Sequence, residues 1–334
     1  MLFDLFTSRS LPISQESAFR RAVPGCFTWL LVIHILMLYG VVGSLSPLTA
    51  GEDAERPLIV VSTTQIADFT RQVAGNRIRV HGILAPGADP HTYQPTPGDA
   101  RLVAGADLVI QNGMFLEGSN WMAVLAQDAG KPVLTATEGV RLLELPEDEQ
   151  EEYRYDPHAW FDPANAAVYV RNITRAVSDL APEHASEFRA RSALYLAQLR
   201  ALDGWIREQL AVLPEGRRLL VTSHDAFEYF ARAYGLRTKA PVGWSTGAEL
   251  GAGLTPARRR EVVNSIRESG VAAIFVETSV NPAVIRQIAE EAGVAVADPL
   301  YSDSMGAPGS AGYTYIGMMR ENVLNIISAL APEE

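Results

Sequence analysis

The chain has 334 residues, of which 48% are hydrophobic and 20% are charged, and its formal net charge is −11. This length and apolar content predict two globular domains with sizeable cores and exclude intrinsic disorder. The acidic balance, with no dense run of Lys and Arg, argues against a nucleic-acid partner, because phosphate binding needs clustered positive charge.

The first 50 residues have the layout of an export signal. Arg9, Arg20 and Arg21 precede a stretch over 22–50 that contains no charged side chain. We predict a signal peptide over 1–50 and a periplasmic mature protein. An uncleaved membrane anchor is the alternative, because the apolar stretch is long enough to provide the roughly 20 helical residues that cross a bilayer.

The single cysteine, Cys26, lies at the front of that apolar stretch, whereas a lipid-modified cysteine would follow it. We therefore predict no lipid anchor and a mature chain without a thiol. This excludes disulfides, thiolate metal ligands and cysteine nucleophiles from the mature protein. Any metal ion must be bound by nitrogen and oxygen atoms.

Short apolar strands alternate with helices along the first half of the mature chain. Strands are predicted at 57–63, 77–85, 106–113 and 131–137, with helices at 66–75 and 97–106. This alternation predicts a parallel α/β domain. Apolar residues at three- and four-residue spacings then predict helices at 162–181 and 183–213. The second of these would span roughly 45 Å, which is long enough for a rigid connecting spine.

The same alternation returns in the second half. The predicted strands are 217–223, 271–279 and 294–300, and the predicted helices are 226–235, 258–270, 281–293 and 314–330. We therefore predict an α/β protein of two lobes, each a parallel-type sheet flanked by helices, joined by one long helix. The expected boundaries are an N-terminal metal-binding lobe over 51–182, a connecting helix over 183–214 and a C-terminal metal-binding lobe over 215–334.

Three of the six histidines lie just beyond predicted strands or before a helix, in turn-like sequences. His91 lies in ADPHTY, His158 in YDPHAWFDP and His224 in VTSHDAF, while Asp303 follows the last strand in ADPLYSDSMG. Ligands of open α/β sheets bind beyond the carboxyl ends of the strands, so these side chains can converge. Three imidazoles and one carboxylate suit a divalent transition metal. Each residue alone also fits an ordinary turn or helix-capping role, and the long spacings between them carry little weight.

Five segments carry a resemblance to a known family: GADPHTYQPTPGD, DPHAWFDP, SHDAFEYFARAYG, IFVETS and LYSDSMG. In this order they resemble the zinc- and manganese-binding solute-binding proteins of ABC importers, the cluster 9 or A-I family. The resemblance covers essentially the whole mature chain. It implies a four-stranded sheet in each lobe, a rigid spine helix, and one metal ion in the cleft between the lobes. An ABC permease with its ATPase is the implied partner.

The same resemblance implies which residues bind the metal ion. His91 and His158 would be the ligands of the first lobe, and His224 and Asp303 those of the second. Manganese-type members often have Glu at the position of His224, and three imidazoles favour zinc over manganese. Zinc-type relatives often carry a histidine-rich insertion, whereas the corresponding segment 144–156 is acidic here. We favour zinc, with manganese next.

The chemistry of imidazole ligands adds two expectations. Metal binding needs neutral imidazoles, so the affinity should fall below about pH 6 as they protonate. The second ring nitrogen of each ligand also needs a partner, and Glu277, Asp225, Asp162 and Tyr93 are the candidates.

Two other classes of function stay open. A metal-dependent hydrolase would need a metal-bound water, whereas four protein ligands indicate a closed site. A surface or adhesion protein stabilised by its metal would unfold without it, whereas a carrier with preformed lobes would stay folded. The glycine-rich segment GAPGSAG at 306–312 lacks the following Lys and Ser or Thr of a phosphate-binding loop, so nucleotide hydrolysis is not supported. We therefore predict an exported, monomeric solute-binding protein rather than an enzyme.

Overall fold

The computed structural model describes residues 56–145, 154–240, 255–271, 273–279 and 282–331. Residues 55–334 form one compact unit. The predicted signal peptide over 1–50, and with it the predicted alternative of a membrane anchor, lies outside the described residues, as does most of the acidic segment 144–156. Among the residues that are described, no helix has both the length and the apolar character needed to cross a membrane.

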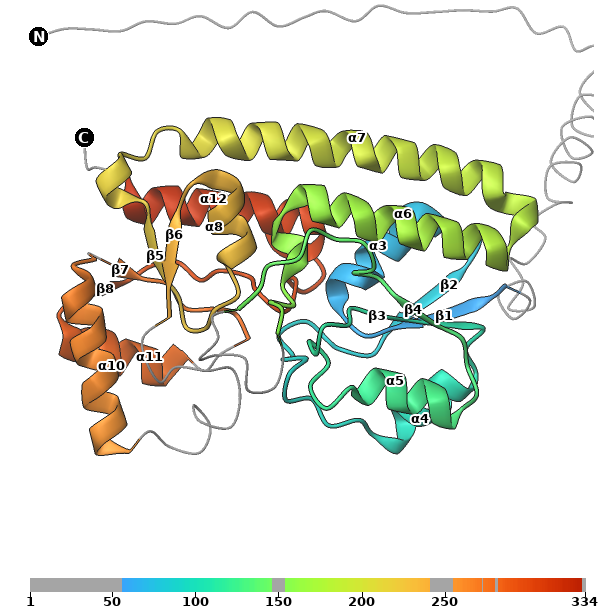
Figure 1. The fold of residues 1–334 in the computed structure, drawn as a ribbon, viewed down its shortest axis with the longest axis horizontal. Coiled ribbons are helices and arrows are strands. Elements are labelled where there is room, and N and C mark those ends of the chain that lie inside the picture. The colour runs from blue at the N-terminus through green and yellow to red at the C-terminus, as the bar shows by residue number, and fades with distance from the viewer. Residues whose placement is uncertain (1–55, 146–153, 241–254, 272, 280–281, 332–334) are drawn as a thin grey trace, which may run out of the picture. The chain divides into compact units, whose positions relative to one another are not determined.

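The first lobe is built on a four-stranded parallel sheet of order β2-β1-β3-β4. Its elements are β1 (Leu58–Val61), α3 (Thr64–Ala74), β2 (Arg79–Gly82), α4 (Pro97–Ala104), β3 (Leu108–Gln111), α5 (Trp121–Asp128), β4 (Val133–Thr135) and α6 (Pro163–Leu180). Helices α3 and α6 cover one face of the sheet, and α4 and α5 cover the other (Figure 1). The central strand β1 is therefore apolar on both faces, and Ile59, Val60 and Val61 are all fully buried.

The second lobe contains two short parallel strand pairs, β5-β6 and β7-β8, in the residues that the structure describes. Its elements are β5 (Leu219–Val221), α8 (Glu228–Tyr234), β6 (Arg237–Lys239), α10 (Pro256–Ser269), β7 (Ala273–Ile274), α11 (Pro282–Ala292), β8 (Ala295–Val296) and α12 (Tyr315–Leu330). The resemblance implied one four-stranded sheet here. Instead, β7 and β8 have two residues each, and a hydrogen bond from Phe275 N to Val221 O (2.9 Å) links the two pairs.

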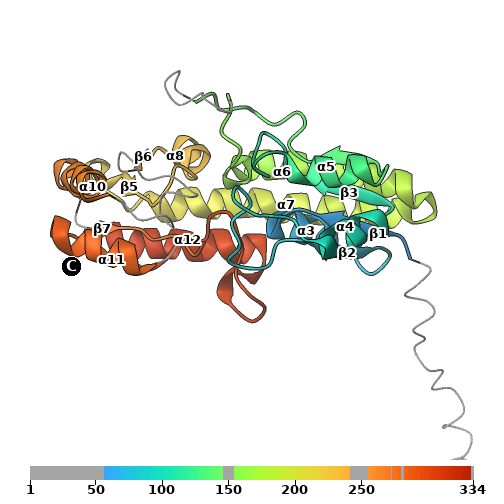
Figure 2. The same ribbon diagram turned by 90° about the horizontal axis from the view of Figure 1, so that it is seen from below.

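Helix α7 (Ala185–Leu210) runs along both lobes and confirms the predicted connecting helix (Figures 1 and 2). It packs on α3 and α6 of the first lobe and on α8 and α12 of the second. Its 26 residues correspond to ~39 Å. The buried side chains follow one face at spacings of three and four residues: Phe188, Ser192, Tyr195, Leu199, Leu202, Ile206 and Leu210. The helix begins later than predicted, because a separate 3-10 turn at Pro182–His184 precedes it.

Candidate metal centre

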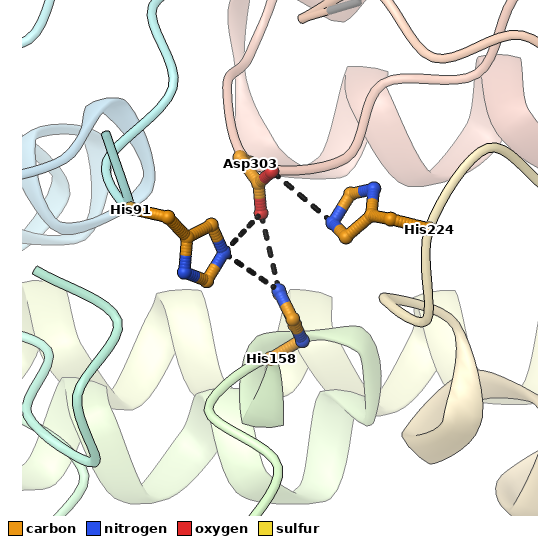
Figure 3. A group of neighbouring side chains, drawn as sticks. All are labelled: His91, His158, His224 and Asp303. Atoms are coloured by element: carbon orange, nitrogen blue, oxygen red, sulfur yellow. Dashed lines mark hydrogen bonds and ion pairs between the residues drawn. The ribbon is translucent and has the colours of Figure 1, made fainter. Parts of the chain in front are cut away.

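Three imidazole rings and one carboxylate meet between the two lobes (Figure 3). The ligand atoms offered by His91, His158, His224 and Asp303 all lie within 4.8 Å of one another. His158, His224 and Asp303 are buried, whereas His91 is partly exposed. The structure thus brings together all four residues that the sequence singled out, with His91 as the member of the group that solvent reaches.

Asp303 lies at the centre of this group. Its Oδ1 is 3.3 Å from His158 Nε2 and 3.7 Å from His91 Nε2, and its Oδ2 is 3.2 Å from His224 Nε2. His91 Nε2 and His158 Nε2 are themselves 3.3 Å apart. Both oxygens of Asp303 are buried, and neither accepts a well-oriented hydrogen bond from the described residues. A buried carboxylate in this position, facing three Nε2 atoms, fits a divalent cation bound among them.

The loop after β2 fixes His91 through its backbone. Asp89 Oδ1 accepts a hydrogen bond from His91 N (2.8 Å), and Trp121 Nε1 donates to Pro90 O (3.1 Å). Gly118 lies so close behind this loop that a Cβ atom there would be 2.1 Å from His91 O. The proline- and glycine-rich sequence therefore produces a rigid loop that packs backbone against backbone beneath a site residue.

We expect Gly118→Ala to weaken metal binding by displacing His91. The new Cβ would overlap the His91 carbonyl, and Gly118 also has a φ of +35°. The expected losses are about ten-fold in metal affinity and about 1–3 kcal/mol in the free energy of unfolding. Calorimetric titration and thermal unfolding measure them. Gly139→Ala is the control, because Gly139 has a φ of +80° with nothing within 4 Å of its Cβ position. Equal affinities of the two variants would contradict the role of Gly118.

His158 precedes the 3-10 turn η2 (Ala159–Phe161), and its ring is fixed by Asp156. Asp156 Oδ1 lies 2.7 Å from His158 Nδ1 and accepts a hydrogen bond from His158 N at 2.8 Å. Because a carboxylate oxygen only accepts, Nδ1 is the donor in this contact, and Nε2 is left facing Asp303 Oδ1. Burial opposes the charged imidazole, but the carboxylates of Asp156 and Asp303 outweigh it and raise the pKa of His158 to about 9.

His224 follows β5 and is fixed in the same manner by Glu277. Glu277 Oε2 contacts His224 Nδ1, while its Oε1 accepts hydrogen bonds from His224 N (3.0 Å) and Ser223 Oγ (2.8 Å). Burial again opposes the charged ring, but Glu277 and Asp303 raise the pKa of His224 well above its ordinary value. Burial also opposes ionisation of Asp303, yet the surrounding imidazoles, His224 foremost, lower the pKa of that carboxyl well below its usual range.

Four residues were predicted to contact the second ring nitrogen of an imidazole ligand, and among the described residues Glu277 alone of these four does so. The other three have local roles: Tyr93 donates to Asp99 Oδ2 (2.9 Å), Asp162 caps α6 by accepting from Ala164 N (2.8 Å), and Asp225 Oδ1 accepts from Ala240 N (3.2 Å). Asp156 was missed. The sequence feature that indicates its role is the repeated Asp-Pro-His at 89–91 and 156–158. In both copies the Asp side chain accepts a hydrogen bond from the His backbone amide.

Comparison with known families gives one continuous match. The family described as the periplasmic zinc-uptake complex component A matches residues 59–329. The metal ABC transporter substrate-binding lipoprotein SloC of Streptococcus mutans is 32% identical over 309 residues, which cover 90% of this chain and 98% of SloC. The manganese-binding lipoprotein MntA of Bacillus subtilis is 35% identical over 84% of this chain and 92% of its own length.

Solved structures agree with this match. The periplasmic zinc-binding protein TroA from Treponema pallidum is 32% identical in sequence and superposes with a TM-score of 0.74. That match covers 83% of this chain and 100% of the TroA chain. A manganese-bound periplasmic metal-binding protein from Candidatus Liberibacter asiaticus, at 25% identity, has a TM-score of 0.69 over 82% of this chain and 100% of its own. Chains similar to this one are therefore named for zinc and for manganese.

Proposed function

Because the chain belongs to the family of the periplasmic zinc-uptake component A, whose members include substrate-binding proteins of metal ABC transporters, we propose that it captures one divalent transition metal ion between its lobes. Zinc is the preferred ion in this proposal, and manganese is the next. The protein then delivers the ion to an ABC permease. His91, His158, His224 and Asp303 are the proposed ligands.

One observation carries this proposal: a buried carboxylate without a well-oriented donor faces three Nε2 atoms across the junction of two lobes. Four protein ligands can complete a tetrahedral site, which leaves no open position for a reactive water. This favours a carrier over a hydrolase.

The preference for zinc rests on the chemistry of the ligands. Imidazole nitrogen suits zinc, whereas manganese prefers oxygen, and three of the four proposed ligands are imidazoles. Affinity also rises from manganese towards zinc for any given ligand set, so zinc binding in the test tube alone does not identify the cargo. The metal found in the native compartment decides this point.

Export and cellular location are part of the proposal. Relatives such as SloC and MntA are named lipoproteins, and TroA is named periplasmic. In this chain Cys26 and the rest of 1–50 lie outside the described residues. We propose a soluble periplasmic protein with a cleaved signal, acting as a monomer.

The metal content of the mature protein tests the function. We expect mass spectrometry of protein purified from its native compartment to find one zinc ion per chain, and His224→Ala to lose it, because the variant removes one of three imidazoles. Manganese at one per chain would keep the role and overturn the choice of metal. Absence of any metal from both proteins would refute the site.

A further inference from the structure

Two tyrosines of the second lobe hold the backbone on either side of His158. Tyr229 on α8 donates a hydrogen bond to Asp156 O (3.2 Å), and Tyr315 at the start of α12 donates to Trp160 O (2.6 Å). The two acceptors lie two residues before and two residues after His158. A side chain that the expected boundaries place in the first lobe is thus tied to the second.

Both hydroxyls are committed to these bonds. Tyr229 Oη accepts a hydrogen bond from Leu143 N (2.9 Å), so its single hydrogen is available to Asp156 O. Asp156 and Trp160, which carry the two acceptor carbonyls, are each 1% exposed, so the carbonyls are buried together with the tyrosines that donate to them. Loss of either hydroxyl would leave a buried carbonyl without its donor, which is more costly than loss of an exposed hydrogen bond.

The segment around Asp303 shows the reverse arrangement. Gln65 Nε2, on α3 of the first lobe, donates to Ser302 O (3.0 Å), and Gly87 N of the same lobe donates to Ser304 Oγ (2.7 Å). These contacts lie immediately before and after Asp303 in the chain. The segment of His158, which belongs to the first lobe by sequence, is therefore held by the second lobe, and the segment of Asp303, which belongs to the second, is held by the first. Separating the lobes would disturb both segments together.

We propose that Tyr229 and Tyr315 are positioning residues that retain the bound metal ion, because their hydroxyls keep His158 beside Asp303 while the lobes are in contact. This inference rests on the proposed function and deepens it. Release of the ion then requires the tyrosine hydrogen bonds to break. Loss of the hydroxyls should therefore speed dissociation, while capture of the ion past the partly exposed His91 is little changed.

The test compares zinc dissociation from the full mature protein and its Tyr→Phe variants. Phenylalanine keeps the buried ring and removes only the hydroxyl. The net value of one hydrogen bond predicts that Tyr229→Phe and Tyr315→Phe each raise the dissociation rate constant about five-fold, and the double variant about 25-fold. Stopped-flow mixing of the zinc-loaded protein with an excess of a chelating dye measures the rate. The association rate constant should stay within about two-fold of wild type.

Tyr234→Phe is the matched control. Tyr234 is a buried tyrosine of the same helix as Tyr229, but its hydroxyl donates to Asp203 Oδ1 of the connecting helix (3.0 Å). We expect it to lower the thermal stability of the metal-free protein as much as Tyr229→Phe does, without changing zinc dissociation. Wild-type dissociation rates in both single variants, or an equal increase in Tyr234→Phe, would overturn the positioning role and leave the carrier function intact. Failure of the wild type to bind zinc or manganese would overturn both.

Discussion

Zinc affinity is expected to fall by about a thousand-fold when Asp303 is replaced by Asn. The substitution keeps the shape of the side chain and removes the negative charge that lies 3.2–3.7 Å from all three Nε2 atoms. Loss of one partner from a buried charged group costs about 3–5 kcal/mol, which corresponds to two to four orders of magnitude in a binding constant. Competitive titration against a chelator of known affinity measures the change.

Asp298→Asn is the control for this experiment. Asp298 is an exposed carboxylate five residues before Asp303, so its replacement makes the same change of net charge away from the site. We expect Asp298→Asn to bind zinc as the wild type does. Zinc affinity of Asp303→Asn within five-fold of wild type would show that the carboxylate is not a ligand, and the proposed coordination would have to be abandoned.

The architecture was largely predictable because strong local patterns govern it. The continuous apolar run around β1 predicted a strand covered on both faces, and the apolar spacing of α7 predicted a long helix. Two elements were missed. Helix α5 begins after Asn120, which is left-handed with φ 55° and whose side chain forms no capping hydrogen bond, and β6 is a polar strand of three residues. Neither carries the start signal or the periodicity on which sequence analysis depends.

The site was predictable only in part, for a related reason. Turn sequences beyond strands indicated His91, His224 and Asp303, and a turn before a helix indicated His158, because the carboxyl ends of parallel strands meet at one edge of a sheet. The partners of those residues depend on side-chain directions that spacing does not determine. Asp225, adjacent to His224 in the chain, bonds to Ala240 N instead. The tyrosines that hold the His158 segment come from more than 70 residues away in the chain.

The second large expected effect is the pH dependence of metal binding. The structure changes the pH range over which the metal affinity is expected to fall. Ordinary imidazoles predict a loss of affinity below about pH 6. In the metal-free site, carboxylates outweigh burial and raise the pKa of His158 to about 9 and that of His224 well above its ordinary value. An incoming ion must therefore displace protons from both rings at neutral pH. The affinity should fall as the pH falls from about 9, not from about 6.

The expected slope follows from the number of protons displaced. Between pH 8 and 6.5, release of one to two protons per ion predicts that zinc affinity falls about 30- to 1,000-fold. Titration calorimetry in buffers of different ionisation enthalpy counts the released protons directly. Asp156→Asn removes a carboxylate that raises the pKa of His158, so it should release about one proton fewer at pH 8 than the wild type. An affinity that stays constant from pH 9 to 7 would mean that the imidazoles are already neutral before the ion arrives, and that the buried carboxylates orient the rings without charging them.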